Sequence, residues 1–388
     1  MSLNNKLGFG LMRLPLKNEN ELTSIDQDQV NKMVDYFMSK GFEFFDTAYP
    51  YHGGMSEQSI KKALVDKYPR ENYKLCNKMP SWLVKSEEDY QKFFQVQIER
   101  CGVDYFDYYL LHVLGEENYD LTIKHNGFEF MKTLKAEGKA KHIGFSAHDN
   151  AEFVDKVLTQ HPEMEFVLLQ INYLDWESEN IEARKCYEVA NKHNTPVMIM
   201  EPLKGGSLVN VPESVEKMYK EHNPDMSIAS WALRFAASLD NIITVFSGMS
   251  NYEQMLDNVS VMEDFQAISS EEQGILDKAI DLINDSIAIP CTNCNYCMDD
   301  CPNEIPIPKY FSLYNQQDQF GFDGNFLEYY RNLAQEFVRA SECNECNICE
   351  EHCPQNIKIA DNLKLVSEVF DKELDSFKAE NASFNIND

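Results

Sequence analysis

Short apolar runs alternate with longer amphipathic stretches along residues 1 to about 283. The apolar runs predict strands buried in a parallel sheet, because both faces of such a sheet are covered by helices. The amphipathic stretches between them predict those helices. The predicted strands are Leu7–Arg13, Phe42–Asp46, Tyr73–Lys78, Phe106–His112, His142–Ser146, Phe166–Gln170, Val197–Glu201 and Ile242–Ser247.

The predicted helices include Gln27–Lys40, Glu57–Lys67, Ser86–Cys101, Gly127–Glu137, Glu152–Gln160, Asn180–His193 and Ile228–Ala237. Eight strands that alternate with helices predict a (β/α)8 TIM barrel of the α/β class. The alternative is a doubly wound open sheet, which is expected to carry a glycine-rich phosphate loop after its first strand. Gly8-Phe9-Gly10 is not followed by the pattern of that loop, so the barrel is favoured.

The character of the chain changes near residue 284, where Asn284-Asp285-Ser286 leads into cysteine-rich sequence. Between the cysteine motifs, aromatic residues such as Tyr310 and Tyr314 recur at helical spacing. We therefore predict two domains: a barrel over residues 1–283, and a small, mainly α-helical domain built around metal over residues 284–388.

The composition agrees with this organisation and excludes some functions. The 388 residues are 43% hydrophobic, enough for one large core and a smaller second domain. The formal net charge of −29 disfavours nucleic acid and anionic membrane surfaces as partners. It is compatible with a basic redox partner protein or with simple solubility. The absence of a long apolar run and of an apolar leader after Met1 predicts a cytoplasmic protein.

Eight of the 11 cysteines form two motifs with the same spacing, C-x2-C-x2-C-x3-C-P. The first motif contains Cys291, Cys294, Cys297 and Cys301, and the second contains Cys343, Cys346, Cys349 and Cys353. Three cysteines at this spacing can bind three irons of a cubane, and in two-cluster ferredoxins the fourth cysteine ligates the other cluster. The motifs therefore predict a ferredoxin-like dicluster domain that holds two [4Fe-4S] clusters.

Exchange of the fourth cysteine predicts two ligand sets. One set is Cys291, Cys294 and Cys297 with Cys353, and the other is Cys343, Cys346 and Cys349 with Cys301. Zinc is the alternative metal, although structural zinc sites usually take two C-x-x-C pairs separated by a longer loop. The remaining cysteines, Cys76, Cys101 and Cys186, fall within strand or helix patterns and are predicted to be buried and inert.

Four polar residues stand at or just after the C-terminal ends of predicted strands, where barrels carry their active sites. They are Asp46, Tyr51, Lys78 and His112. A lysine at the end of an apolar strand needs a charged partner, so we expect Asp46 to pair with Lys78. A cation beside Tyr51 is expected to lower the pKa of its phenol and to make it a proton donor to a carbonyl oxygen that His112 orients. Each residue alone also has a structural explanation; their combination on consecutive strands indicates a site.

The motifs around these residues resemble the aldo/keto reductases over roughly residues 5 to 283. They are Phe45–Tyr51, Asn77-Lys78, Asp107–His112 and Gly144-Phe145-Ser146. The resemblance implies that Asp46, Tyr51, Lys78 and His112 form the catalytic tetrad of that family. With the cysteine motifs added, the whole chain is similar to the iron–sulfur aldo/keto reductases found in anaerobic microbes.

The resemblance also implies a nicotinamide cofactor, NADP or NAD, across the mouth of the barrel. Hydride would pass to the carbonyl carbon of a small-molecule substrate, or back from the alcohol, while Tyr51 handles the proton. The implied cofactor contacts are Ser146, Gln170, Glu201, Pro202, Leu203, Ser247, Gly248, Met249, Gln254 and Asn258.

Several positions depart from the family pattern. Ala147 replaces an Asn that the family often has, and Met200 stands where an aromatic residue stacks on the nicotinamide. The basic residues that hold the 2′-phosphate of NADPH are replaced near Gly248 and Gln254, which predicts weaker discrimination for NADPH. Lys204 is either a phosphate contact or a solvated loop lysine.

Two classes of function follow. The first is an oxidoreductase whose barrel reduces carbonyl compounds, with clusters that relay electrons or serve only as structure. The second is an electron-transfer or interaction protein whose barrel is catalytically idle. A nicotinamide moves two electrons as hydride, whereas each cluster moves one, and the sequence shows no flavin motif that would join them.

Overall fold

The computed structural model describes residues 6–18, 21–178, 181–291, 297–298, 301–320, 327, 330–331, 333–334, 337–351, 353, 355 and 357–383. The chain divides into two compact units. The larger unit comprises residues 1–209 and 222–276, and the smaller comprises residues 210–221 and 277–388. Across the described part of the chain, we find no helix with both the length and the apolar character needed to span a membrane.

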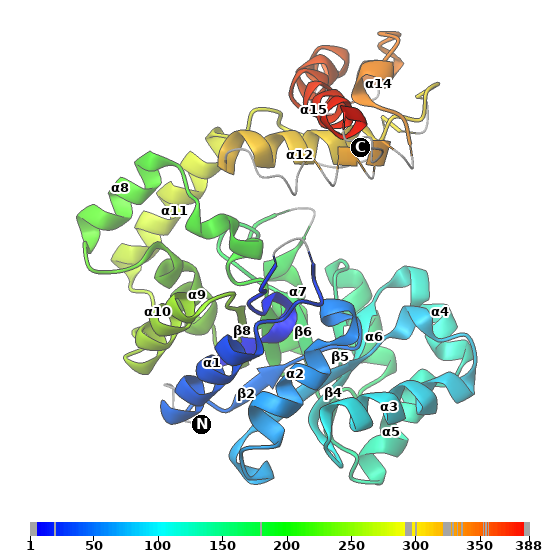
Figure 1. The fold of residues 1–388 in the computed structure, drawn as a ribbon, viewed down its shortest axis with the longest axis vertical. Coiled ribbons are helices and arrows are strands. Elements are labelled where there is room, and N and C mark those ends of the chain that lie inside the picture. The colour runs from blue at the N-terminus through cyan, green and yellow to red at the C-terminus, as the bar shows by residue number, and fades with distance from the viewer. Residues whose placement is uncertain are drawn as a thin grey trace. The chain divides into compact units, whose positions relative to one another are not determined.

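Eight parallel strands of the larger unit close into a barrel in chain order, with β8 paired to β1. They are β1 (Leu7–Gly10), β2 (Phe44–Asp46), β3 (Lys74–Met79), β4 (Phe106–Leu114), β5 (Ala140–Ala147), β6 (Phe166–Gln170), β7 (Val197–Met200) and β8 (Ile242–Gly248). The predicted barrel is confirmed, and Figure 1 shows its strands enclosed by helices.

The helices of the larger unit follow the strands. They are α1 (Gln27–Ser39), α2 (Ser56–Ile60), α3 (Glu87–Cys101), α4 (Glu116–Lys124), α5 (Gly127–Ala136), α6 (Ala151–Gln160), α7 (Ala183–Lys192), α9 (Ile228–Ser238) and α10 (Tyr252–Glu263). Two further helices, α8 (Glu213–His222) and α11 (Ser270–Asp285), each cross a boundary between the units.

Polar side chains fix where several of these helices begin. Asp26, Asn150, Ser227 and Asn251 each accept a hydrogen bond from a backbone N–H of the first turn of α1, α6, α9 and α10, respectively. These caps satisfy donors that have no partner within the helix. The cap at Asn251 matters most for function, because it sets the start of α10 beside the cavity described below.

Two predicted elements end more than one residue before their predicted bound. The first strand was predicted to reach Arg13, but β1 ends at Gly10, opposite Asp46 of β2 and Gly248 of β8. Both neighbouring strands stop at the same level, so the chain turns into a short 3-10 helix, Leu11–Arg13. The predicted helix Glu57–Lys67 is α2 followed by a π-helical turn, Lys61–Val65.

The interior of the barrel is filled by side chains from alternate strand positions. The inward cluster contains Phe44, Cys76, Tyr108, Leu110, Phe166, Leu168, Met198 and Phe246. Gly144 lacks a side chain because a Cβ there would lie 2.3 Å from the backbone oxygen of Phe166. This packed interior supports the strand ends above it, where the polar residues of the site lie.

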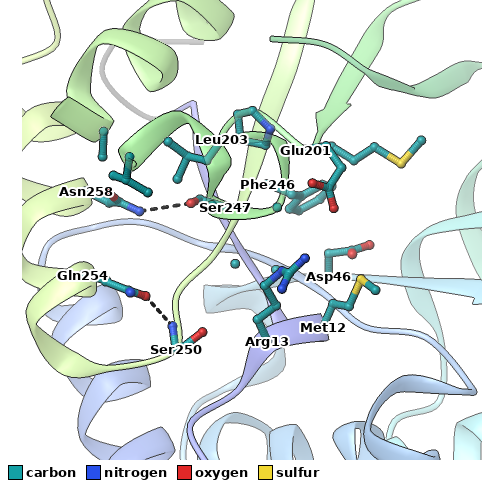
Figure 2. Close-up of a pocket in the computed structure, with 18 of the residues that line it drawn as sticks. Met12, Arg13, Asp46, Glu201, Leu203, Phe246, Ser247, Ser250, Gln254 and Asn258 are labelled. Atoms are coloured by element: carbon teal, nitrogen blue, oxygen red, sulfur yellow. Dashed lines mark hydrogen bonds between the residues drawn. The ribbon is translucent and has the colours of Figure 1, made fainter. Parts of the chain in front are cut away.

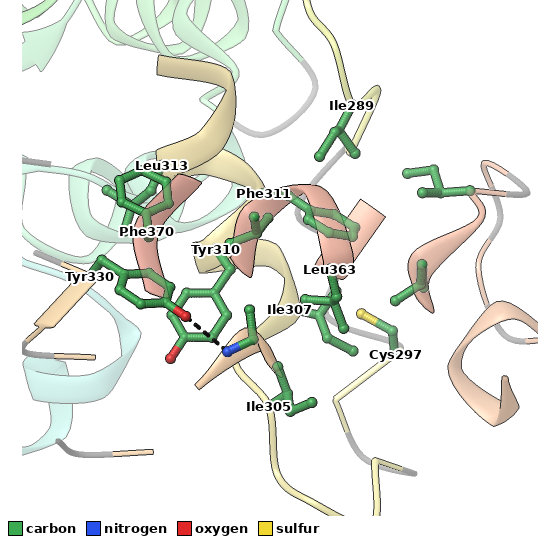
Figure 3. Close-up of a cluster of buried hydrophobic side chains, with 14 of the residues drawn as sticks. Ile289, Cys297, Ile305, Ile307, Tyr310, Phe311, Leu313, Tyr330, Leu363 and Phe370 are labelled. Carbon is green, nitrogen blue, oxygen red and sulfur yellow. Dashed lines mark hydrogen bonds between the residues drawn. The ribbon is translucent and has the colours of Figure 1, made fainter. Parts of the chain in front are cut away.

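The smaller unit has its own apolar core, formed mainly by α12 (Ile307–Phe320) and α15 (Ile359–Ser383), with the short α14 (Ile348–Glu351) nearby. Figure 3 shows Tyr310, Tyr330 and Phe370 packed together in it. The Tyr330 hydroxyl accepts from the Ala340 N–H at 2.9 Å and lies 2.9 Å from Asp371. Cys297 and Cys349 are buried in this cluster, so the core of this unit is built around cysteine positions.

Candidate active site

The predicted pairing of Asp46 with Lys78 is present in the structure. The Lys78 ammonium donates to Oδ2 of Asp46 at 2.6 Å and to the backbone oxygen of Thr47 at 2.9 Å. Lys78 is 1% exposed and Asp46 is 5% exposed, so the pair is removed from water. Burial is the largest single effect and would lower the pKa of Lys78, but Asp46, followed by Tyr51 and Cys76, acts in the opposite direction, and together they raise that pKa. Lys78 therefore carries a fixed positive charge.

Tyr51 lies beside this pair, but its acidity differs from the prediction. The Lys78 Nζ is 4.7 Å from the centroid of the Tyr51 ring. We expected this cation to lower the phenol pKa. Burial instead raises the pKa of Tyr51, and the nearby Asp46 charge adds to that effect, so that Lys78 only partly offsets them. Tyr51 is therefore a protonated phenol across the neutral range.

His112 completes the group at the end of β4. Its ring lies 6.1 Å from the Tyr51 ring, centroid to centroid, and 5.1 Å from the Trp82 ring. Burial, with help from the Lys78 charge, holds the pKa of His112 well below its usual value, so the imidazole is neutral. Its Nδ1 is buried and has no hydrogen-bond partner among the described residues. The four residues of the predicted tetrad therefore lie together.

A buried polar network supports Lys78 from the outer side of β3. The Asn77 side-chain oxygen accepts from the Lys78 N–H at 2.8 Å, and the Gln97 amide donates to the Lys78 carbonyl at 2.9 Å. The Asn77 amide donates to Glu57 at 2.8 Å, and Tyr109 donates to Gln97 at 2.5 Å. Both backbone groups of Lys78 are thus held by side chains. The sequence pattern did not predict this network, because its members come from four separate elements, α2, β3, α3 and β4.

A cavity of about 430 Å³ adjoins the tetrad in the larger unit. Asp46 and Tyr51 line one part of it, and apolar groups such as Met200, Leu203 and Phe246 line another. Figure 2 shows side chains from the first turn after β1, the loop after β7 and helix α10 around this space. Its size and mainly apolar lining are typical of a site for a small molecule or cofactor.

Arg13 brings a positive charge into this cavity. Its side chain runs past two glycines: a Cβ at Gly205 would lie 3.1 Å from an Arg13 guanidinium nitrogen, and one at Gly248 would lie 3.3 Å from Arg13 Cδ. Figure 2 shows the guanidinium pointing into the cavity. Arg13 was not predicted as a site residue. Its position directly after the first strand, at the barrel mouth, was the available signal.

Most of the predicted cofactor contacts line the cavity. They are Glu201, Pro202, Leu203, Ser247, Gly248, Gln254 and Asn258. The Asn258 amide donates to the Ser247 hydroxyl at 3.0 Å, and Gln254 accepts from the Ser250 N–H at 2.7 Å. These bonds tie the first two turns of α10 to the end of β8 and to the loop after it.

Three other predicted contacts lie outside the cavity lining. Ser146 is fully buried and accepts from the Val113 N–H at 2.8 Å. Gln170 lines a separate small pocket with Ala147 and His148. Met249 is fully buried.

The loop after β7 contains residues in the left-handed backbone conformation and is held by the carboxylate of Asp175. Glu201 and Lys204 have φ of 55° and 48°, and the next two residues are glycines with positive φ. Lys204 donates to Asp175 at 2.6 Å, and Asp175 also accepts from Gln170 at 2.9 Å. Lys204 is thus a partly exposed loop lysine that is paired with Asp175, and it does not line the cavity. Asp175 links it to the end of β6.

One predicted cluster ligand set is assembled in the smaller unit. Cys301, Cys343, Cys346 and Cys349 line one small cavity. Burial, together with the neighbouring thiols, raises the pKa of Cys349 to about 11. The four sulfurs thus lie near one another although Cys301 is distant in sequence from the other three. Cubane ligation would need these thiols as thiolates, so cluster binding would release their protons.

The second predicted set is described only in part. Cys297 is buried, and Cys291 and Cys353 pack against the same apolar cluster, while Cys294 lies outside the described residues. In the described part of the chain, no three His, Cys, Asp or Glu side chains are close enough to hold a single metal ion. A cubane spreads its ligands over four irons, so its thiolates lie farther apart than the roughly 4 Å between the ligands of one tetrahedral ion.

The aldo/keto reductase family model matches residues 6–281, and the 4Fe-4S dicluster domain model matches residues 290–358. The Escherichia coli NADH-specific methylglyoxal reductase is 25% identical over 265 residues, which cover 57% of this chain and 79% of that protein. The Arabidopsis thaliana L-galactose dehydrogenase is 24% identical over 60% of this chain and 77% of its own length. A Glycine max protein named "Probable aldo-keto reductase 1" is 32% identical, over 36% of this chain and only 41% of its own length.

Solved structures have the same barrel. An aldo-keto reductase from Klebsiella pneumoniae, in complex with NADPH, superimposes with a TM-score of 0.57 at 19% identity over 70% of this chain and 90% of that one. The holo form of an aldo-keto reductase from Bacillus halodurans superimposes with a TM-score of 0.58 at 23% identity over 71% of this chain and 91% of that one. At these identities the likeness extends to the fold alone.

Proposed function

Since this chain belongs to the aldo/keto reductase family and also carries a 4Fe-4S dicluster domain, we propose that its barrel reduces the carbonyl group of a small molecule, or oxidises the corresponding alcohol, with a nicotinamide cofactor. The observation that carries this proposal is the buried ion pair of Lys78 and Asp46 beside Tyr51 at the edge of the cavity. An idle barrel would have no need of a buried charge pair next to an open cavity.

In the proposed reaction Tyr51 is the general acid. Its raised pKa keeps the phenol protonated, so it holds the proton that a carbonyl oxygen gains on reduction. The Lys78 charge, fixed by Asp46, stabilises the tyrosinate that remains. The neutral His112 keeps one N–H that can hold the substrate oxygen toward Tyr51. The nicotinamide, when bound, supplies the hydride to the carbonyl carbon.

The cavity residues fit a nicotinamide dinucleotide. Arg13 and the N-terminal turn of α10 provide positive potential for a pyrophosphate, and the apolar groups near Met200 accept a ring face. Arg13 is the one Lys or Arg among the described residues that line the cavity, whereas Glu253 and Asp257 bring carboxylates to its α10 side. This balance favours the ribose hydroxyls of NADH over the 2′-phosphate of NADPH.

For the C-terminal part we propose two [4Fe-4S] clusters, held by the two exchanged cysteine sets. The cavity that Cys301 shares with Cys343, Cys346 and Cys349 supports the set formed by these four cysteines. We further propose that the clusters pass single electrons to a redox partner protein. The proposed domain boundary remains near residue 284, between the two matched family models.

The decisive experiment uses the full chain after anaerobic reconstitution with iron and sulfide. Tyr51→Phe should abolish reduction of carbonyl substrates by NADH while leaving cofactor binding intact. Retention of wild-type turnover by this variant would refute the tetrad mechanism. If NADH bleaches the visible absorbance of the clusters without an added flavin, the two redox systems communicate. If it does not, an electron relay from the barrel cofactor to the clusters is refuted.

A further inference from the structure

The residue after Tyr51 holds an unusual backbone conformation. His52 has φ of 52° and ψ of 43°, in the left-handed region. Few residues with a side chain adopt this region, and they remain there only when their surroundings hold them. Gly53 and Gly54 follow with positive φ, which glycine adopts without strain. A glycine would therefore satisfy the backbone at position 52 more easily than the histidine that is present.

The imidazole of His52 explains what holds it. The Leu14 N–H donates to Nε2 at 3.0 Å, and Nδ1 lies 2.8 Å from the Leu22 carbonyl oxygen. Because Nε2 accepts a hydrogen bond, Nδ1 carries the ring proton and donates it to Leu22. The residue is 7% exposed and its bond to Leu14 is buried, so water cannot easily replace that bond, whereas the bond to the exposed Leu22 is only partly buried. One ring thus joins the Tyr51 loop to two points on the segment after β1.

Both joined segments belong to the cavity. Leu14 directly follows the turn that carries Met12 and Arg13, which line the cavity on one side. Tyr51 directly precedes His52 and lines the same cavity. We propose that His52 is a positioning residue that sets Tyr51 against the cavity wall formed by Met12 and Arg13. This inference rests on the proposed function, because it assumes that Tyr51 is the acid and that the cavity binds the cofactor.

The two hydrogen bonds of the His52 ring hold both the cavity wall, where the cofactor would bind, and the loop of Tyr51, which would transfer the proton. Without the ring, the Leu14 N–H would lose its buried acceptor, and the turn before it would be free to shift. Tyr51 would lose the same anchor, because its own backbone is otherwise tied within its own turn, by its N–H to the Ala48 oxygen at 3.2 Å and by its carbonyl to the Met55 N–H. Since small misplacements of catalytic groups strongly reduce turnover, loss of the ring should affect kcat and cofactor affinity together.

The test compares His52→Gly and His52→Asn with Asn194→Gly in the reconstituted full chain. Glycine relieves the left-handed strain and removes the ring, and asparagine tolerates the conformation but cannot span both bonds. Asn194 is an exposed residue with φ of 55°, so its variant controls for strain relief alone. Measurements are kcat, the NADH dissociation constant without substrate, and the midpoint of thermal unfolding.

We expect kcat to fall by about 10- to 100-fold and the NADH dissociation constant to rise several-fold in both His52 variants. The midpoint for His52→Gly should change little, because strain relief offsets the lost bonds, and Asn194→Gly should keep wild-type kcat and affinity. Wild-type kcat and affinity in the His52 variants would overturn the inference, whatever their unfolding midpoints. If His52→Gly does not fold, His52→Asn decides the question.

Tyr51→Phe separates this inference from the proposed function. A fully active Tyr51→Phe variant would refute the proposed function regardless of the His52 results. An inactive Tyr51→Phe variant combined with normal His52 variants would overturn the positioning role alone.

Discussion

The ammonium of Lys78 and the carboxylate of Asp46 lie 2.6 Å apart, and both are shielded from water at the mouth of the barrel. A buried ion pair of this kind contributes little net stability by itself, but each charge depends on the other. Stability and catalysis therefore share this pair. The Lys78 charge that would stabilise a tyrosinate is maintained only as long as Asp46 is present.

Asp46→Asn should destabilise the protein because it leaves the Lys78 ammonium buried without a counter-charge. We expect a loss of about 3 to 5 kcal/mol in the free energy of unfolding, measured by urea denaturation. The double variant Asp46→Asn/Lys78→Met should recover much of that loss, since it removes the isolated charge. A double variant that is no more stable than Asp46→Asn would contradict this explanation.

Tyr51→Phe should lower kcat for carbonyl reduction by about 100-fold or more, because the substrate oxygen loses its proton donor. The raised pKa of Tyr51 also sets a pH dependence. Reduction needs the phenol, so its rate should persist through neutral pH and fall only in strongly alkaline solution. Alcohol oxidation needs the tyrosinate, so its rate should rise over the same range. Steady-state rates in both directions from pH 6 to about 11 would check this.

His112 should make stability depend on pH in the acid range. Its folded-state pKa lies well below the unfolded value of about 6.5, so the unfolded chain binds the proton more tightly. Its contribution is fully present above that value and is lost as pH falls through it toward the folded-state pKa. The slope is about 1.4 kcal/mol per pH unit for one such group. In His112→Gln, the free energy of unfolding should depend less steeply on pH in this range, by about 1.4 kcal/mol per pH unit. An unchanged pH dependence of the free energy of unfolding would show that other groups cause it.

The cavity charges predict a preference for NADH. Gln254→Arg should lower the NADPH dissociation constant by about tenfold, because it places a guanidinium beside the expected 2′-phosphate. Arg13→Gln should weaken NADH and NADPH alike, since the pyrophosphate is common to both. Fluorescence titration of the wild type and of both variants with each cofactor measures these dissociation constants. A wild-type protein that binds NADPH more tightly than NADH would be inconsistent with the role assigned to Glu253 and Asp257.

Iron content can test the exchange of cysteines between motifs. Cys301→Ala and Cys346→Ala should each remove about half of the bound iron, and their double variant should lose no more than either alone, because both residues serve one cluster. The matched control is Cys301→Ala/Cys291→Ala, which should lose nearly all iron. Loss of all iron in Cys301→Ala/Cys346→Ala would mean that each motif binds its own cluster. Zinc in place of iron after anaerobic preparation would refute the iron–sulfur proposal.

The barrel could be predicted from the sequence because its signal is repeated along the chain. Each strand is an apolar run, and strand order in a barrel follows chain order, so each strand pairs with its neighbours in sequence. The tetrad was found for the same reason, since Asp46, Lys78 and His112 stand at successive strand ends. Periodicity could not show that β1 stops at Gly10, because that depends on where its neighbours end.

Features that depend on burial, or on partners distant in the sequence, could not be predicted from the sequence pattern. The sign of the Tyr51 pKa shift required its burial, which exceeds the effect of the Lys78 charge that the sequence revealed. The pairing of the loop residue Lys204 with Asp175 could not be predicted, because the two residues are 29 positions apart in the chain. His52 carried no recognisable motif, because its partners are backbone groups of another loop.

The polar network behind Lys78 also bears on how the barrel forms. Successive side chains of a strand face opposite sides, so a slip of one residue in β3 would exchange Lys78 with Asn77. The lysine would then meet the helix layer, and the amide would face the barrel mouth. The hydrogen bonds of Asn77 to Glu57 and of Gln97 to the Lys78 carbonyl exist only in the native alignment. They therefore discriminate against misaligned strand pairing during folding, in addition to holding the finished site.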